Sequence, residues 1–290
     1  MFALNPPALN LMKSKFILMF SFIWLAALVS LAADGRQIVP LSSLPVAAQK
    51  TIRTQAGEGK IGDVERVEED GDVYFDATVT KDGTDRSLSV GEEGALLSME
   101  VVLSETPEVV RKVIQTQVGT GSLDNIDKVL TGGKESYDVD FTTKDKVERN
   151  LVVGADGKLE QLQVSLAEVS VAARNTIETR AGQLKLGDIF KIFDASGISY
   201  DVEMLQDGKS REFSVADDGK LESREVFISE LPGPAAATVK EKVGDGKILR
   251  IDEVFTKRAG VFPYEVEGRK EGKAFNFSVG PKGRFLGMDE

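Results

Sequence analysis

The feature that most constrains the fold is a motif that returns every 62 to 64 residues. One copy reads VVGADGKLEQLQV, and the glycine at its centre recurs at Gly94, Gly157, Gly219 and Gly283. A preceding valine and an upstream glycine keep the same period, at Val90, Val153, Val215 and Val279 and at Gly57, Gly119, Gly182 and Gly244. Three anchors with one period indicate a supersecondary unit that is repeated four times along the chain.

Each unit opens with a helical pattern. In TPEVVRKVIQTQVG, apolar residues such as Val110 and Ile114 stand four apart, which places them on one helix face. Thr106 is predicted as the N-cap, Pro107 as the first helical residue, and Gly119 as the end of the helix.

Strand patterns follow the helix. A short strand is predicted where two apolar residues stand three apart, as Ile61 and Val64 do. The next strand alternates, so that Tyr137 and Val139 face one side while Asp138 faces the other. In the first unit Phe75, not Tyr74, takes the place of the tyrosine. Two more strands complete an antiparallel meander, joined by the turn of the glycine motif.

These patterns predict an α+β fold of four tandem repeats, each with one helix packed on a four-stranded antiparallel sheet. Units of this size are marginal alone without disulfides, so neighbouring units should pack together. The predicted boundaries are 40–103, 104–166, 167–229 and 230–290.

Residues 1–33 have the pattern of a signal peptide. Lys13 and Lys15 precede an uncharged apolar run over 16–31. The small residues Ala32 and Ala33 follow this run. We therefore expect export to the periplasm or the extracellular space. An uncleaved anchor is the alternative, although the run is short for a membrane span. The true start and the cleavage site stay open, with Met12 as a second candidate start.

Composition narrows the function. The chain has no His and no Cys, which excludes disulfides, Cys/His zinc sites and His-dependent triads. Its 36 basic and 47 acidic residues give a net charge of −11, which argues against binding to nucleic acid or anionic membranes. No nucleotide-binding or nucleophile motif occurs, so we expect no enzyme activity, catalytic residues or cofactor.

The acidic pair before the motif glycine raises the question of calcium. An EF-hand loop needs oxygen ligands at its first, third and fifth positions and Glu at the twelfth. With Gly219 at position six, Glu225 fits, but Ser214 and Ala216 do not supply the set. The other copies fit less well, so the motif is interpreted as a hairpin turn and no metal site is expected.

The alternating strands place one acidic residue of each unit on the uncovered face. This predicted row of Asp76, Asp138, Asp201 and Glu265 is a candidate partner-binding surface, or else a solvated face that prevents edge aggregation. The recurring tyrosines Tyr137, Tyr200 and Tyr264 are in phase with Val and Met, which favours core packing over a recognition role.

The pattern of helix, Y-[DE]-V-[DE], DGK and DG-K-L resembles PepSY-like domains, a group similar in fold to beta-lactamase-inhibitor protein. The third unit, YDVEMLQDGKSREFSVADDGKLE, matches best. The second has Asp145-Lys146 in place of the hairpin glycine, and the fourth has Pro281-Lys282 in place of the acidic pair. The resemblance covers residues 40–290, and its motifs encode turns and core.

The resemblance implies an exported, non-enzymatic module that binds another protein and acts as an inhibitor or regulator of an envelope or secreted hydrolase. The alternative is an envelope protein that binds a small molecule or a cation on its acidic sheet face. The partner's identity and the oligomeric state are not predicted.

Overall fold

The computed structural model describes residues 36–290 except 70, 207–208, 256–259, 271–272 and 289–290. The predicted signal peptide at 1–33 lies outside the described residues. Within them, seventeen strands form one sheet with four α-helices, and each strand pairs antiparallel with the next in sequence. The predicted α+β class with antiparallel sheet is confirmed.

The elements come in four successive groups, each with one helix followed by four strands. The first group is preceded by β1 (Gln37–Val39) and comprises α1 (Val46–Ala56), β2 (Lys60–Glu69), β3 (Asp72–Lys81), β4 (Thr84–Gly91) and β5 (Leu96–Glu100). The second comprises α2 (Glu108–Val118), β6 (Ser122–Thr131), β7 (Lys134–Thr142), β8 (Glu148–Gly154) and β9 (Leu159–Gln163).

The third group comprises α3 (Val171–Ala181), β10 (Lys185–Asp194), β11 (Gly197–Gln206), β12 (Lys209–Ala216) and β13 (Leu221–Glu225). The fourth comprises α4 (Gly233–Val243), β14 (Lys247–Val254), β15 (Tyr264–Lys270), β16 (Lys273–Val279) and β17 (Phe285–Met288). A short 3-10 helix precedes each α-helix, namely η1 (Leu41–Ser43), η2 (Leu103–Glu105), η3 (Leu166–Glu168) and η4 (Ile228–Glu230).

The helices end where the sequence predicts, but α2 begins differently. Gly119 has φ +57° and follows α2, and its N–H donates to the carbonyl of Gln115. The predicted N-cap Thr106 is wrong, because its backbone N–H and hydroxyl both bond to Leu103 O and close η2. Pro107 occupies the N-cap position instead, in an extended conformation without a side-chain cap.

The first strand of each group is longer than predicted. β2 spans ten residues and contains a register shift between Ile61 and Val64. Such a β-bulge inserts a residue, so apolar residues three apart can point to the same side. The same shift occurs between Leu123 and Asn125 in β6, and in β10 and β14. The spacing that suggested a short strand therefore comes from a bulge in a long one.

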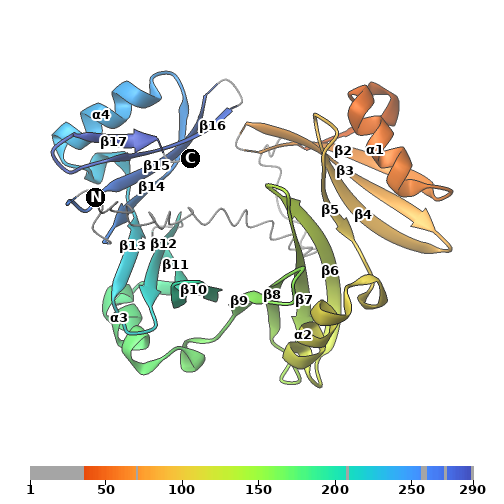
Figure 1. Cartoon of the computed structure of the whole chain (residues 1–290), viewed down its shortest axis with the longest axis horizontal. Helices are drawn as coiled ribbons and strands as arrows, with labels where there is room; N and C mark the ends of the chain where they lie inside the picture. The colour runs from red at the N-terminus through yellow and green to blue at the C-terminus, as the bar shows by residue number, and fades with distance from the viewer. Residues whose placement is uncertain (1–35, 70, 207–208, 256–259, 271–272, 289–290) are drawn as a thin grey trace, which may run out of the picture.

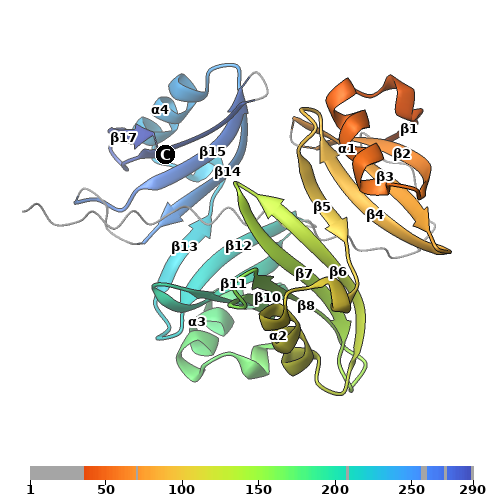
Figure 2. The ribbon, with the colours of Figure 1, turned by 45° about the vertical axis from the view of Figure 1, so that its right-hand side comes forward.

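Each helix covers one face of its own four strands. Ala48 and Ile52 of α1 are fully buried against Phe75, Ala77 and Val90 of the first group. Separate clusters of the same design lie beneath α2, α3 and α4. In Figures 1 and 2 the helices lie on the outer side of the curved sheet, and its other face is turned inward.

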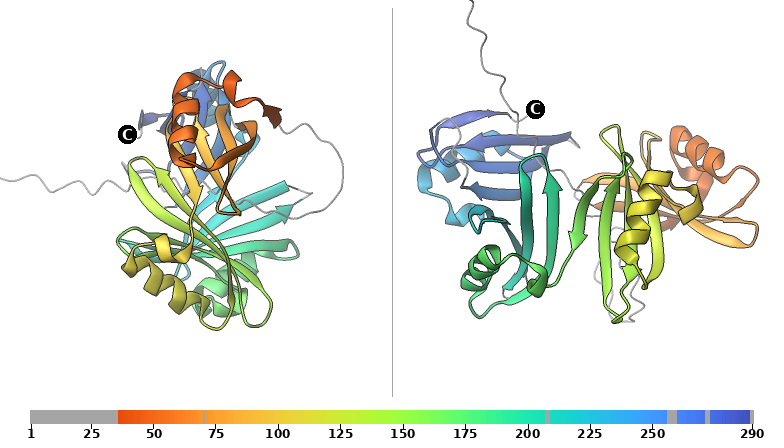
Figure 3. Two further views of the ribbon diagram at one scale, coloured as in Figure 1. Left: turned by 90° about the vertical axis from the view of Figure 1, so that its right-hand side faces the viewer. Right: turned by 60° about the horizontal axis from the view of Figure 1, so that its bottom comes forward.

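The groups are joined through their sheets. β5 pairs with β6, β9 with β10, and β13 with β14, and we call these the first, second and third junctions. Seen from the side, the first and fourth groups lie at one end of the molecule and the second and third at the other (Figure 3). Arg269 of the fourth group donates hydrogen bonds through both terminal nitrogens to the carboxylate of Asp72 in the first group. The chain therefore curves back until its fourth group contacts its first.

Candidate functional site

The predicted acidic row lies on the inner face of the sheet, which we define as the face without helices. Phe75 and Ala77 belong to the core beneath α1, so Asp76 between them points to the opposite side. The same alternation places Asp138, Asp201 and Glu265 on the inner faces of their groups.

The row is less exposed than predicted. All four carboxylates are half-buried rather than solvated. The Ser89 hydroxyl donates to Asp76, and the Ser214 hydroxyl donates to Asp201. The adjacent strand thus supplies a hydrogen-bond donor, a placement that depends on strand register and cannot be seen in alternation alone.

The second group departs from this arrangement. Val152 lies opposite Asp138 in the ladder, where the serine stands in the first and third groups. Asn150 compensates from a diagonal position, since its amide donates to Asp138 and, over 3.0 Å, to Asp140.

The first junction also carries a row of three carboxylates, one on each of three neighbouring strands. Glu100 of β5 is the ladder partner of Asp127 in β6, and Asp127 is the partner of Asp138 in β7. Like charges directly opposite each other weaken strand pairing. Asn125, a neutral side chain, donates to Asp127 over 2.6 Å.

The pKa values of this row reflect burial among like charges. Burial raises the pKa of Asp127 to about 6, the Asn125 bond opposes the rise, and repulsion from Glu100 and Asp140 adds to it. Burial raises the pKa of Asp138 to about 7, against the Asn150 bond and with repulsion from Asp140 and Asp127. Asp127 and Asp138 are thus poised to take up protons close to neutral pH.

The third junction has the same row with a cation beside it. Glu225, Asp252 and Glu265 are successive ladder partners across β13, β14 and β15. Arg250 donates to Asp252 over 2.6 Å through Nε and 3.0 Å through Nη2, and it also donates to Glu212.

Arg250 and Asn125 occupy corresponding positions. Each follows the bulge of its strand and precedes a buried isoleucine, Ile251 or Ile126. Burial alone would lower the pKa of Arg250, but Asp252 and Glu212 outweigh it and raise that pKa. One position therefore decides whether the carboxylate row is neutralised from within the chain.

The second junction carries no such row. Gln163 of β9 faces Phe190 of β10, and Phe190 faces Asp201. The Gln163 amide donates to Asp188 over 2.8 Å. An amide and an aromatic ring thus replace two carboxylates.

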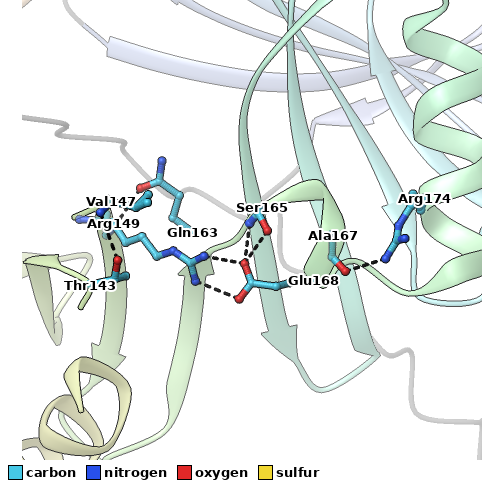
Figure 4. Close-up of polar contacts among 9 residues, drawn as sticks. Thr143, Val147, Arg149, Gln163, Ser165, Ala167, Glu168 and Arg174 are labelled. Atoms are coloured by element: carbon cyan, nitrogen blue, oxygen red, sulfur yellow. Dashed lines mark hydrogen bonds and ion pairs between the residues drawn. The ribbon is translucent and has the colours of Figure 1, made fainter. Parts of the chain in front are cut away.

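All three junctions share an ion pair that the sequence reading missed. Arg149 of β8 bonds to Glu168 of η3, with Nη2 and Oε2 2.6 Å apart, and Glu168 also accepts from the backbone N–H and hydroxyl of Ser165 (Figure 4). The Arg149 bond, followed by those from Ser165, lowers the pKa of Glu168 to about 2 despite partial burial. The counterparts are Arg86 with Glu105 and Arg211 with Glu230. Their spacing of 62 or 63 residues was the signal that could have revealed them.

The tyrosine prediction is confirmed. Tyr137, Tyr200 and Tyr264 are all buried in the cores beneath the helices, and Phe75 takes the equivalent place in the first group. The hydroxyl of Tyr200 donates to Asp217 over 2.8 Å, and that of Tyr137 donates to Glu135 over 2.6 Å. They do not form a recognition surface.

The motif glycine forms a hairpin turn that packs against the helix. Gly157 has φ +81°, and its N–H donates to Gly154 O over 2.8 Å. A Cβ at Gly157 would come within 2.9 Å of the Val109 side chain at the start of α2. Asp156, which directly precedes the glycine, accepts a hydrogen bond from the backbone N–H of Lys158 within the same turn. The motif thus joins two strands in a turn, and its glycine leaves room for the start of α2.

Across the described residues, no group of three or more acidic side chains is arranged to hold a metal ion. No described helix combines the length and apolar character needed to cross a membrane.

No protein-family description matches the sequence, and no curated protein is similar to it at the sequence level. Among solved structures, a DUF2874 family protein from Bacteroides ovatus is 16% identical with a TM-score of 0.31, over 40% of this chain and 84% of that one. A protein of unknown function from Bacteroides vulgatus, provisionally described as periplasmic, is 19% identical with a TM-score of 0.30, over 45% and 99%. A Bacteroides thetaiotaomicron protein with the provisional name of a calcium-regulated periplasmic protein is 16% identical with a TM-score of 0.30, over 45% and 97%.

Proposed function

We propose that the chain is an exported, non-enzymatic protein of four tandem PepSY-like repeats, which binds a basic segment of a partner protein on its inner sheet face. The repeats correspond to residues 40–103, 104–166, 167–229 and 230–290, and export rests on the signal-peptide pattern at 1–33. The resemblance adds the expected role, inhibition or regulation of a hydrolase in the envelope or outside the cell.

One observation carries the choice of a basic partner. At the third junction a guanidinium, that of Arg250, already lies among the inner-face carboxylates. At the first junction the corresponding residue is Asn125, and no arginine or lysine of the described residues forms an ion pair with Asp127 or Asp138. An arginine or lysine side chain of a partner would meet there the arrangement that Arg250 meets within the molecule.

The sequence and the inner-face carboxylates agree with a role in binding rather than catalysis. The motifs of the chain encode turns and core rather than chemistry, and the residue types needed for His- or Cys-based catalysis are absent from the sequence. A half-buried acidic surface favours specific recognition over simple solubility, because desolvated charges gain more from a partner than solvated ones.

The test uses a fluorescent hexa-arginine peptide as the probe at pH 7.5 and low salt. Wild type is expected to bind it, and Asn125→Arg to weaken binding by about tenfold because it supplies the cation internally. Gln115→Arg is the matched control, since it adds the same charge on an exposed position of α2 and should leave binding unchanged. Equal weakening by both variants, or no binding by wild type, would contradict the proposal.

A further inference from the structure

The first junction is held by a short ladder. Within the described part of the chain, three residue pairs join β5 to β6: Ser98 with Val129, Met99 with Lys128, and Glu100 with Asp127. One further backbone bond, from Val101 N–H to Ile126 O over 2.9 Å, extends it. One of the three pairs therefore brings two carboxylates together at the joint between two packed groups.

The groups facing this pair are acidic on every neighbouring strand. β5 contributes Glu100, β6 contributes Asp127, and β7 contributes Asp138 and Asp140. The charged groups that act on Asp140 in turn are Asp124 of β6 and Glu148 of β8.

The nearest lysine in the ladder does not offset this charge. Lys128 follows Asp127 in β6, so it points to the other side of the sheet, where it pairs with Glu135 over 2.6 Å. The donors to the carboxylates of this row are neutral: the amides of Asn125 and Asn150 donate to Asp127 and Asp138, and the backbone N–H and hydroxyl of Ser87 donate to Glu100.

We infer that the first junction is a proton-responsive joint, in which protonation of Asp127 and Asp138, beside Glu100 in the same row, tightens the pairing of β5 with β6 and deprotonation loosens it. At the third junction burial also raises the pKa of Glu225, but Arg250 opposes that rise, so the response there is weaker. The inference concerns the free chain and does not depend on a partner.

Proton linkage gives the direction in which the stability of the junction changes with pH. Asp127 and Asp138 have pKa values raised to about 6 and about 7, so the closed junction binds protons that an opened, hydrated junction would release. The junction is therefore tightest below about pH 4, where both acids are protonated whether it is closed or open, and it loosens as the pH rises from there to about 7.

Hydrogen–deuterium exchange of the full chain between pH 5.5 and 8.5, corrected for intrinsic rates, tests this. Peptides spanning 96–102 and 125–131 should lose protection by at least about tenfold over this range. Peptides spanning 222–227 and 250–255, at the third junction, should change by less than about twofold over the same range.

Exchanging the two corresponding residues gives a reciprocal test. Asn125→Arg should make the first junction nearly independent of pH, and Arg250→Asn should make the third junction pH-dependent. Gln115→Arg is the charge-matched control and should behave as wild type. The inference is overturned if Asn125→Arg keeps the wild-type pH dependence, or if both wild-type junctions respond alike.

Circular dichroism would reveal misfolding of Asn125→Arg, and Asp127→Asn then provides a second test of the inference. This isosteric change imitates the protonated acid, so the first junction should be protected at pH 8.5 as wild type is at pH 5.5. Loss of protection in Asp127→Asn at pH 8.5 would equally overturn the inference.

Discussion

The first and third junctions have corresponding strands and the same register, yet they differ in how charge is balanced. Both place three carboxylates side by side across successive strands. At the third, Arg250 bonds to Asp252 and Glu212, whereas at the first Asn125 offers Asp127 a neutral amide. The comparison teaches that one backbone design can carry a fixed joint and a titratable one, according to a single side chain.

The largest effect is expected from removing the cation of the third junction. Arg250→Asn should lower the free energy of unfolding by about 3 kcal/mol at pH 7, because it leaves half-buried carboxylates without their counter-charge. Urea denaturation followed by circular dichroism measures this. Lys240→Asn removes the same charge from an exposed position of α4 and should cost far less. A similar cost for the two variants would remove the distinction between the junctions.

A smaller effect of opposite sign is expected at the first junction. Burial raises the pKa of Asp138 to about 7, against an unfolded value near 4, so the ionised form opposes folding at high pH. Asp138→Asn should therefore raise the free energy of unfolding by about 2 kcal/mol at pH 8, with little change at pH 3, which is below the pKa of the unfolded acid. Denaturation curves at both pH values measure the difference.

Asp76→Asn is the matched comparison for Asp138. Burial also raises the pKa of Asp76, but the hydroxyl of Ser89 opposes the rise from the facing position. Its gain at pH 8 should be smaller than that of Asp138→Asn. Equal gains would show that the replacement of serine by Val152 has no consequence.

The smallest effect is expected from the ion pair that the junctions share. Arg149→Met should cost less than about 1 kcal/mol, because Glu168 is 44% exposed and solvent screens the pair. The pKa of Glu168 is lowered to about 2, so this contribution is present above about pH 4 and is lost as the pH falls toward 2. Arg86→Met and Arg211→Met should behave alike, and a large difference among them would mean that the junctions differ in more than the carboxylate rows.

Much of the fold was within reach of the sequence. Periodicity identified the helices and the buried tyrosines, and Gly119 marked a helix end because its conformation favours glycine. Thr106 misled because its hydroxyl and N–H close a 3-10 turn, which uses the same residue types as a helix cap. The strand lengths misled because a bulge changes the spacing of apolar residues.

The candidate site was only partly within reach. Alternation placed Asp138 on the inner face, but its burial and its neighbours Asp127 and Glu100 depend on pairing between strands of different groups. Such registers are set by the packing of the whole sheet and leave no local pattern. The sequence shows that Asn125 and Arg250 differ. The effect of that difference depends on the carboxylates around each residue, and their positions follow only from the structure.

The most direct test of the central claim is a carboxyl carbon-13 NMR titration of Asp127 and Asp138 in the full chain. The account predicts midpoints near pH 6 and pH 7, each moved toward acid pH in Asn125→Arg. Midpoints near pH 4 for both residues, as for solvated aspartates, would contradict it.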